Sequence, residues 1–132
     1  MNVALVPAPP ANLFQTIRKT LQIDPAAVTA LAVERAQREQ KECAAIGWKR
    51  SWADVLDWAM TLTMTEASSA LDGALADRER SGITVTELRA RALDLYASLA
   101  ESAIPPRKAE AARFRAEAAA LRAPAAFSIA AE

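Results

Sequence analysis

Apolar and polar residues follow one another along the chain with the spacing of amphipathic helices. In one segment the apolar residues recur three or four positions apart, as when one side of a helix is buried; they are Val28, Leu31, Ala32, Ala36, Cys43 and Ile46. Asp24 before Pro25 predicts the start of this helix, and Gly47 predicts its end. The whole pattern predicts five helices, over about 13–22, 25–46, 52–80, 84–103 and 107–122.

The third predicted helix is the longest and is apolar on more than one side, so we expect it to be central. Ser51 is a suitable N-cap for it, and Gly82 can end it. The run from Thr84 to Glu87 is a capping-box pattern that opens the fourth helix. Short connections between long helices favour antiparallel neighbours. The sequence therefore predicts an all-α fold, an antiparallel helical bundle of four to five helices.

Three regions are expected: a Pro-rich N-terminal arm over residues 1–12, a bundle core over 13–104, and an Ala-rich C-terminal helix and tail over 105–132. The C-terminal helix has few large side chains, chiefly Phe114 and Leu121, and is predicted to pack weakly or against another chain. Self-association as a homodimer or higher oligomer is expected. The tryptophans near the start of the third helix are interpreted as core or interface anchors; they are Trp48, Trp52 and Trp58.

The composition excludes several classes of function. The chain has 132 residues with sixteen basic and sixteen acidic side chains, so its net charge gives no general attraction to nucleic acid or anionic lipid. Histidine is absent, which excludes His-dependent catalysis and His-ligated zinc. Cys43 is the only cysteine and is expected to be a buried, inert thiol. With no signal peptide and no membrane span expected, the predicted location is the cytoplasm.

Glu66 is the only charge between Trp58 and Leu71. On a helix Glu66 falls on one line with Trp52, Val55, Ala59, Leu62, Ala70 and Gly73, and we expect this line to point inward. An inward carboxylate is costly unless it is paired, hydrogen-bonded or bound to a metal. Two interpretations remain open: an ion pair with an arginine or a wet seam of the bundle, and a functional site.

The fourth helix carries a second polar line opposite its apolar face, made of Glu87, Arg91, Asp94, Ser98 and Glu101. One interpretation is a solvated face with ion pairs within this helix, each contributing little. The other is that Glu87, Arg91 and Asp94 turn toward Glu66 and form a polar pocket. The basic residues of the fifth helix are interrupted by acids, so nucleic-acid binding is disfavoured.

The order of these residues resembles the MazG-like, all-α nucleoside triphosphate pyrophosphohydrolases, which carry ExxE on one helix and ExxD on a later one. The segment from Glu66 to Asp72 (EASSALD) is similar to the first motif and its continuation. Glu87, Arg91 and the run Leu93-Asp94-Leu95 are similar to the second. Upstream, residues 34–38 (ERAQR) and the Trp48/Trp52 region resemble the entry helix of phage-type members, which is rich in Glu and Arg. The resemblance covers about residues 30–100.

The resemblance implies a Mg²⁺ site, with Glu66 and Glu87 as catalytic ligands, Asp94 and Ser69 as further ligands, and Arg91 on the substrate phosphates. Two of the four motif acids are exchanged, because Ser69 and Thr84 stand where the family has glutamates. Hydroxyls attract a hard cation less than carboxylates do. The resemblance implies either a Mg²⁺-dependent hydrolase releasing pyrophosphate or an inactive nucleotide-binding relative. A third hypothesis, independent of the resemblance, is a helical adaptor that acts through protein–protein interaction.

Overall fold

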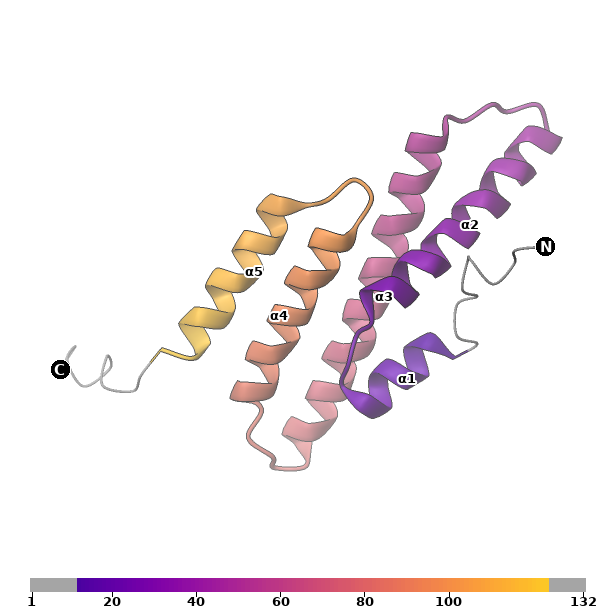
Figure 1. Cartoon of the computed structure of the whole chain (residues 1–132). Coiled ribbons are helices and arrows are strands. Elements are labelled where there is room, and N and C mark those ends of the chain that lie inside the picture. The colour runs from indigo at the N-terminus through magenta and orange to yellow at the C-terminus, as the bar shows by residue number, and fades with distance from the viewer. Residues whose placement is uncertain (1–11, 124–132) are drawn as a thin grey trace, which may run out of the picture.

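The computed structural model describes residues 12–123 and contains five helices joined by short connections (Figure 1). Their bounds are α1 Leu13–Thr20, α2 Pro25–Ala45, α3 Trp52–Arg80, α4 Thr86–Ser102 and α5 Lys108–Leu121. No strand occurs within the described part, so the predicted all-α bundle is confirmed. The predicted arm, residues 1–12, falls outside the description except for Asn12, and so do residues 124–132 of the predicted C-terminal tail.

Two antiparallel hairpins make up most of the molecule (Figure 1). The first is formed by α2 and α3, and the short α1 packs on α3. The second is formed by α4 and α5; α4 contacts both α2 and α3, whereas α5 packs mainly on α4. The third helix therefore lies among three partners, as its several apolar sides predict. Between residues 12 and 123, no helix is long and apolar enough to cross a membrane.

Local signals in the sequence fix most helix ends. The Asp24 side chain accepts a hydrogen bond from the Ala26 amide, and the Ser51 hydroxyl accepts one from the Asp54 amide, so both predicted N-caps are confirmed. Gly47 and Gly82 have φ of 81° and 79°, the left-handed conformation that a helix-ending glycine adopts readily.

Two predicted helix ends are wrong. The first helix stops at Thr20, not near 22, because Leu21 adopts φ 55° and donates its amide to the Ile17 carbonyl. The fourth helix begins at Thr86 with Val85 at the N-cap and no side-chain cap, so the capping box expected from Thr84 does not form.

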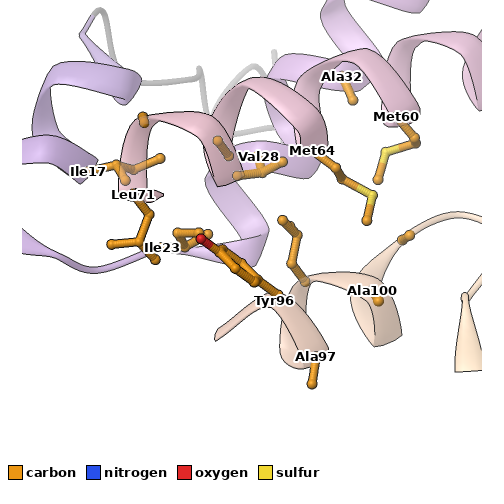
Figure 2. Packing of buried hydrophobic residues seen from close by; sticks show 14 of the residues in the cluster. Ile17, Ile23, Val28, Ala32, Met60, Met64, Leu71, Tyr96, Ala97 and Ala100 are labelled. Atoms are coloured by element: carbon orange, nitrogen blue, oxygen red, sulfur yellow. The ribbon is translucent and has the colours of Figure 1, made fainter. Parts of the chain in front are cut away.

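The core lies where α1, α2 and α4 meet α3, and Figure 2 shows Ile17, Val28, Met64 and Tyr96 among the buried side chains there. Small buried residues on α2, such as Ala32 and Ala36, let this helix pack closely on α3, while larger side chains fill the remaining space of the core. The largest fully buried side chains are Ile17, Val28, Val55, Met60, Thr63, Leu71, Leu75 and Leu99.

The buried line of α3 is rotated from the predicted one. It runs through Val55, Ala59, Thr63, Ala67, Ala70 and Ala74. Thr63, a polar residue, occupies the place expected for Leu62, and it is accommodated because its hydroxyl donates a 2.7 Å hydrogen bond to the Ala59 carbonyl. Leu62 and Trp52, expected to point inward, are instead exposed, at 38% and 40%.

Candidate functional site

Glu66 lies at the seam between α2 and α3, where Arg35 holds its carboxylate. The guanidinium donates two hydrogen bonds, Nη1 to Oε1 at 3.0 Å and Nη2 to Oε2 at 3.2 Å. Arg35 Nη1 also donates to the Thr63 hydroxyl at 3.1 Å, and the guanidinium stands 5.8 Å from the centre of the Phe14 ring. The side chains of Glu66 and Arg35 are 37% and 22% exposed. Glu66 is therefore half-buried and neutralised, as in the ion-pair interpretation.

Glu87 and Asp94 lie on the face of α4 that meets the end of α5, where both accept hydrogen bonds from Arg122. Arg122 Nη2 and Nε donate to the two Glu87 carboxylate oxygens at 3.2 and 3.4 Å, and Nη1 donates to Asp94 Oδ2 at 2.7 Å. The hydrogen bonds to Glu87, and next the hydrogen bond to Asp94, raise the pKa of Arg122 above its usual range. Arg122 follows α5 directly, so both acids hold the end of that helix against α4.

A further ion pair between α4 and α5 lies seven positions after Asp94. Arg115 donates two hydrogen bonds to Glu101, at 2.6 and 2.7 Å. Glu87, Asp94 and Glu101 are spaced seven positions apart on α4, and Arg115 and Arg122 have the same spacing on α5. We call these five residues the α4–α5 ion ladder. The acids of this line therefore pair with arginines of and just after α5, and not within α4 as the first interpretation expects.

The remaining predicted site residues lie elsewhere. Arg91 is exposed and lines a shallow hollow of about 240 Å³ with Asp94, Ser98 and the α1–α2 connection. Ser69 is exposed and lines a hollow of about 230 Å³ between α3, α4 and α5. Glu66 and Glu87 take their arginines from different helices, α2 and the end of α5.

The donor set does not fit a resident Mg²⁺ in this arrangement. Across residues 12–123, no three acidic or cysteine side chains gather closely enough to hold a metal ion. Each carboxylate that the resemblance implies already accepts hydrogen bonds from a guanidinium, which a cation would have to displace. The magnesium site stays a prediction, and it would require these arginines to move away from the carboxylates.

A groove runs between α3 and α5, with α4 as its floor. Its wider part has a volume of about 670 Å³ and is lined mostly by apolar side chains, among them Leu93, Phe114 and Leu121. Its narrower part, about 230 Å³, adjoins it at Tyr96 and Phe114, which line both. The two aromatic rings meet edge to face with centroids 5.6 Å apart.

Tyr96 carries the polar link across this groove from α4 to α3, and Figure 2 shows its ring extending from α4 toward α3. Its hydroxyl is 2.7 Å from Asp72 Oδ1 and 3.2 Å from the Ser68 carbonyl oxygen, both acceptors. Arg89 donates to the same Asp72 oxygen at 3.2 Å. Burial, followed by the bond to Asp72, raises the pKa of Tyr96 far above its usual range. Tyr96 therefore acts as a neutral donor that fixes α4 to α3.

Large apolar side chains are exposed in two groups, apart from the single exposed residues Ile83, Ile104 and Leu121. One group, which we call the tryptophan tip, surrounds the α2–α3 connection: Ile46 is 79% exposed, Trp48 55% and Trp52 40%. The other, Trp58 and Leu62, lies on the outer side of α3. The three tryptophans are thus outside the core, so the core interpretation is wrong and the interface interpretation stays a prediction. Cys43 is buried and free, as predicted.

Comparisons with models of known protein families, with characterised proteins and with solved structures find no match to this chain. The class of protein is therefore defined by the fold and its surface: residues 12–123 form an all-α arrangement of five helices with exposed tryptophans and arginine-paired acids.

Proposed function

We propose that the protein is a non-enzymatic helical adaptor that binds a protein partner through the tryptophan tip. The observation that carries the proposal is that three large apolar side chains are exposed in one seven-residue stretch around a helix connection. They are Ile46, Trp48 and Trp52. Scattered single apolar residues on a surface are ordinary, but grouped ones mark interaction sites. Tryptophan is the residue most enriched among those that dominate binding energy.

The tip is supported as a fixed surface by its own contacts. Arg50 stacks on the Trp48 ring at 5.0 Å and pairs with Glu39 on α2 at 3.3 Å. Gln40 donates a 3.2 Å hydrogen bond to the Arg50 carbonyl, and the Trp48 amide donates to the Cys43 carbonyl at 2.9 Å. A connection held in this way loses little conformational freedom on binding, which favours affinity.

The test is partner recovery from cells of the source organism, quantified by mass spectrometry. The double variant Trp48→Ala/Trp52→Ala is compared with wild type and with Ile83→Ala, a control at the opposite end of α3 where Ile83 is 47% exposed. A loss of about 2 kcal/mol per anchor would lower recovery of a specific partner more than tenfold, with Ile83→Ala unchanged. Equal recovery by the tip variant would contradict the proposal, provided that thermal unfolding is unaltered.

A lipid surface is the competing target for this tip. Trp48 and Trp52 flank Lys49 and Arg50, and aromatic residues beside basic ones also suit the headgroup region of a membrane. Sedimentation with anionic vesicles, using the same variants, separates the two. Protein recovery without vesicle binding supports the adaptor, whereas tip-dependent vesicle binding overturns it.

A second candidate is the hydrolase, or its inactive nucleotide-binding relative, that the resemblance implies. Its specific support is the half-buried polar cluster of Glu66, Arg35 and Thr63, in which a carboxylate and an arginine are held together inside the helix pair. Mg²⁺ binding would require this ion pair to open.

Pyrophosphate release from a panel of ribo- and deoxyribonucleoside triphosphates, with Mg²⁺ or Mn²⁺, tests this candidate. Turnover lost in both Glu66→Gln and Glu87→Gln supports the hydrolase. Thermal stabilisation by nucleotide without release supports the binding relative. If millimolar nucleotide gives neither pyrophosphate release nor thermal stabilisation, both the hydrolase and the nucleotide-binding relative are ruled out.

A further inference from the structure

The wider part of the α3–α5 groove lies at the end of the hairpin where α5 stops. Leu93 lines it from α4, and Phe114 and Leu121 line it from α5; Leu121 is 39% exposed. α5 ends at Leu121, and the antiparallel α4 begins at Thr86, which lines the same part of the groove (Figure 1). The chain therefore leaves α5 at the edge of a largely apolar hollow of about 670 Å³.

The α4–α5 ion ladder fixes the point from which the chain continues. Arg122, the residue after α5, donates hydrogen bonds to Glu87 and to Asp94 on α4. The residues that follow Arg122 therefore start beside the groove. A segment joined to its site by a short tether has an effective concentration in the millimolar range. Contacts too weak to hold a free peptide are then sufficient to hold such a segment.

The sequence after Arg122 has the composition of a segment that packs on an apolar surface. Residues 123–131 (APAAFSIAA) carry no charge. Their two large side chains, Phe127 and Ile129, are two positions apart, the spacing that places side chains on one side of an extended chain. Pro124 lacks the amide hydrogen that a further turn of α5 would use. The sequence therefore favours a change of chain direction here and an extended segment with one apolar side.

We propose that residues 124–132 fold back along the α3–α5 groove and place Phe127 in its wider part, against Leu93, Phe114 and Leu121. Phe127 follows Leu121 by six positions, a span of at most about 20 Å. Phe114 precedes Leu121 by seven positions on α5, which is about 10 Å along the helix axis. Phe127 can therefore reach the length of the hollow. The volume lies in the range of about 300–1,000 Å³ that holds whole small ligands, so the side chains of Phe127 and Ile129 fit together.

The groove is then occupied by the protein's own chain, and an external apolar ligand would have to displace this segment. The proposal does not rest on the adaptor function, because the tryptophan tip lies at the start of α3 and the wider part of the groove lies beside Asp72, near its end. A Trp48→Ala/Trp52→Ala protein should therefore behave as wild type in both experiments below.

Disulfide trapping tests the position of the segment in the full chain. Glu117→Cys/Ser128→Cys joins an exposed groove residue of α5 to the segment and keeps Phe127 and Ile129. Ala119→Cys/Ser128→Cys is the matched control: Ala119 is exposed and nearer to Ser128 in sequence, but it lies about 200° around α5 from Glu117. Cys43 is buried and stays in both variants.

Under mild oxidation at micromolar protein, we expect the disulfide within one chain to form at least about fivefold faster for the Glu117 variant. Adding Phe127→Ala/Ile129→Ala to that variant should lower its rate to that of the control. Equal rates for the two cysteine pairs, or a rate that these alanines leave unchanged, overturns the proposal. A disulfide that joins two chains also overturns it and assigns the groove to the segment of a second copy.

Binding of the dye anilinonaphthalene sulfonate, which fluoresces on exposed apolar surface, tests which segment fills the groove. Phe127→Ser/Ile129→Ser is compared with Val3→Ser/Leu5→Ser, which changes residues 1–11, the other part of the sequence outside the description. We expect fluorescence to rise at least threefold for the first variant and to stay at the wild-type value for the second. A rise in the second variant alone assigns the groove to the N-terminal residues, and no rise in either means that the groove is unfilled; both outcomes overturn the proposal.

Discussion

Replacing Glu66 by glutamine distinguishes a structural role of this carboxylate from a functional one. The variant keeps the shape of the side chain but removes its charge, so Arg35 at the α2–α3 seam loses a bidentate partner. Breaking a fully buried ion pair costs about 3–5 kcal/mol, whereas fully exposed pairs contribute about 0–1 kcal/mol. With side chains 37% and 22% exposed, solvent screening reduces the effect, and we expect a loss of about 1–3 kcal/mol.

That loss corresponds to a fall in Tm of roughly 4–12 °C for a domain of this size. A double-mutant cycle with Arg35→Gln isolates the pairwise free energy, because Arg35 also packs near Phe14 and contributes through its alkyl chain. The assay is urea unfolding followed by circular dichroism, at low salt and at 1 M salt. Glu34→Gln, in an exposed Glu–Arg pair on α2, is the control, with an expected change below about 0.5 kcal/mol.

The opposite result would refute this reasoning. A residue kept for binding at the expense of stability leaves the protein equally or more stable when it is neutralised. An unchanged or higher Tm for Glu66→Gln, together with a Mg²⁺-dependent rise in Tm that wild type shows and the variant lacks, would identify Glu66 as a ligand and revive the hydrolase hypothesis.

Three further outcomes are expected. Tyr96→Phe removes the hydroxyl that links α4 to α3 and should lower the free energy of unfolding by about 1–2 kcal/mol, measured in urea; an unchanged value would mean that water replaces it. Gly73→Ala should stabilise by about 0.5–1 kcal/mol, since the new methyl group meets only the flexible end of Arg18, at 3.0 Å; a destabilised variant would mean that Arg18 cannot move. The hydrogen bond from Arg115 lowers the pKa of Glu101. The pair therefore stabilises the fold above the usual pKa of glutamate, about 4.3, and this stabilisation is lost as the pH falls through the lowered pKa. Acid unfolding of Glu101→Gln should show a weaker pH dependence than that of wild type.

The helices themselves were predictable because their signals are local. Asp24 and Ser51 cap through an amide two or three residues away, and Gly47 and Gly82 act through their own backbone conformation. The errors came where a tertiary choice intervened. Which of Leu62 and Thr63 enters the core depends on how α2 crosses α3, and helical spacing alone fixes the buried side only to within about one residue.

The partners of the acids were not predictable from spacing along one helix. Arg35 is 31 positions from Glu66, and Arg122 is 35 positions from Glu87, so each pair depends on how the helices dock. A signal was nevertheless present. The acids of the α4–α5 ion ladder and its arginines both repeat every seven positions, in helices joined by a short connection. In an antiparallel hairpin, two such series of opposite charge meet along one edge. The same acids that resemble a metal motif therefore also fit an ion-paired helix seam.

Replacing Arg122 by glutamine separates these two roles of Glu87 and Asp94. The change removes the guanidinium that donates to both carboxylates and leaves them free of that partner on α4. If the acids serve only to hold α5, the variant is slightly less stable than wild type and gains no affinity for Mg²⁺, because two carboxylates on a solvated helix face attract a hard cation weakly. If they are metal ligands masked by the arginine, the variant binds Mg²⁺ more tightly, and its Tm rises with added Mg²⁺ more steeply than that of wild type. Isothermal calorimetry and thermal melts across a Mg²⁺ series measure both, with Arg115→Gln, which frees only one carboxylate, as the control. We expect the first outcome, because in this fold the arginine belongs to the helix that the acids hold.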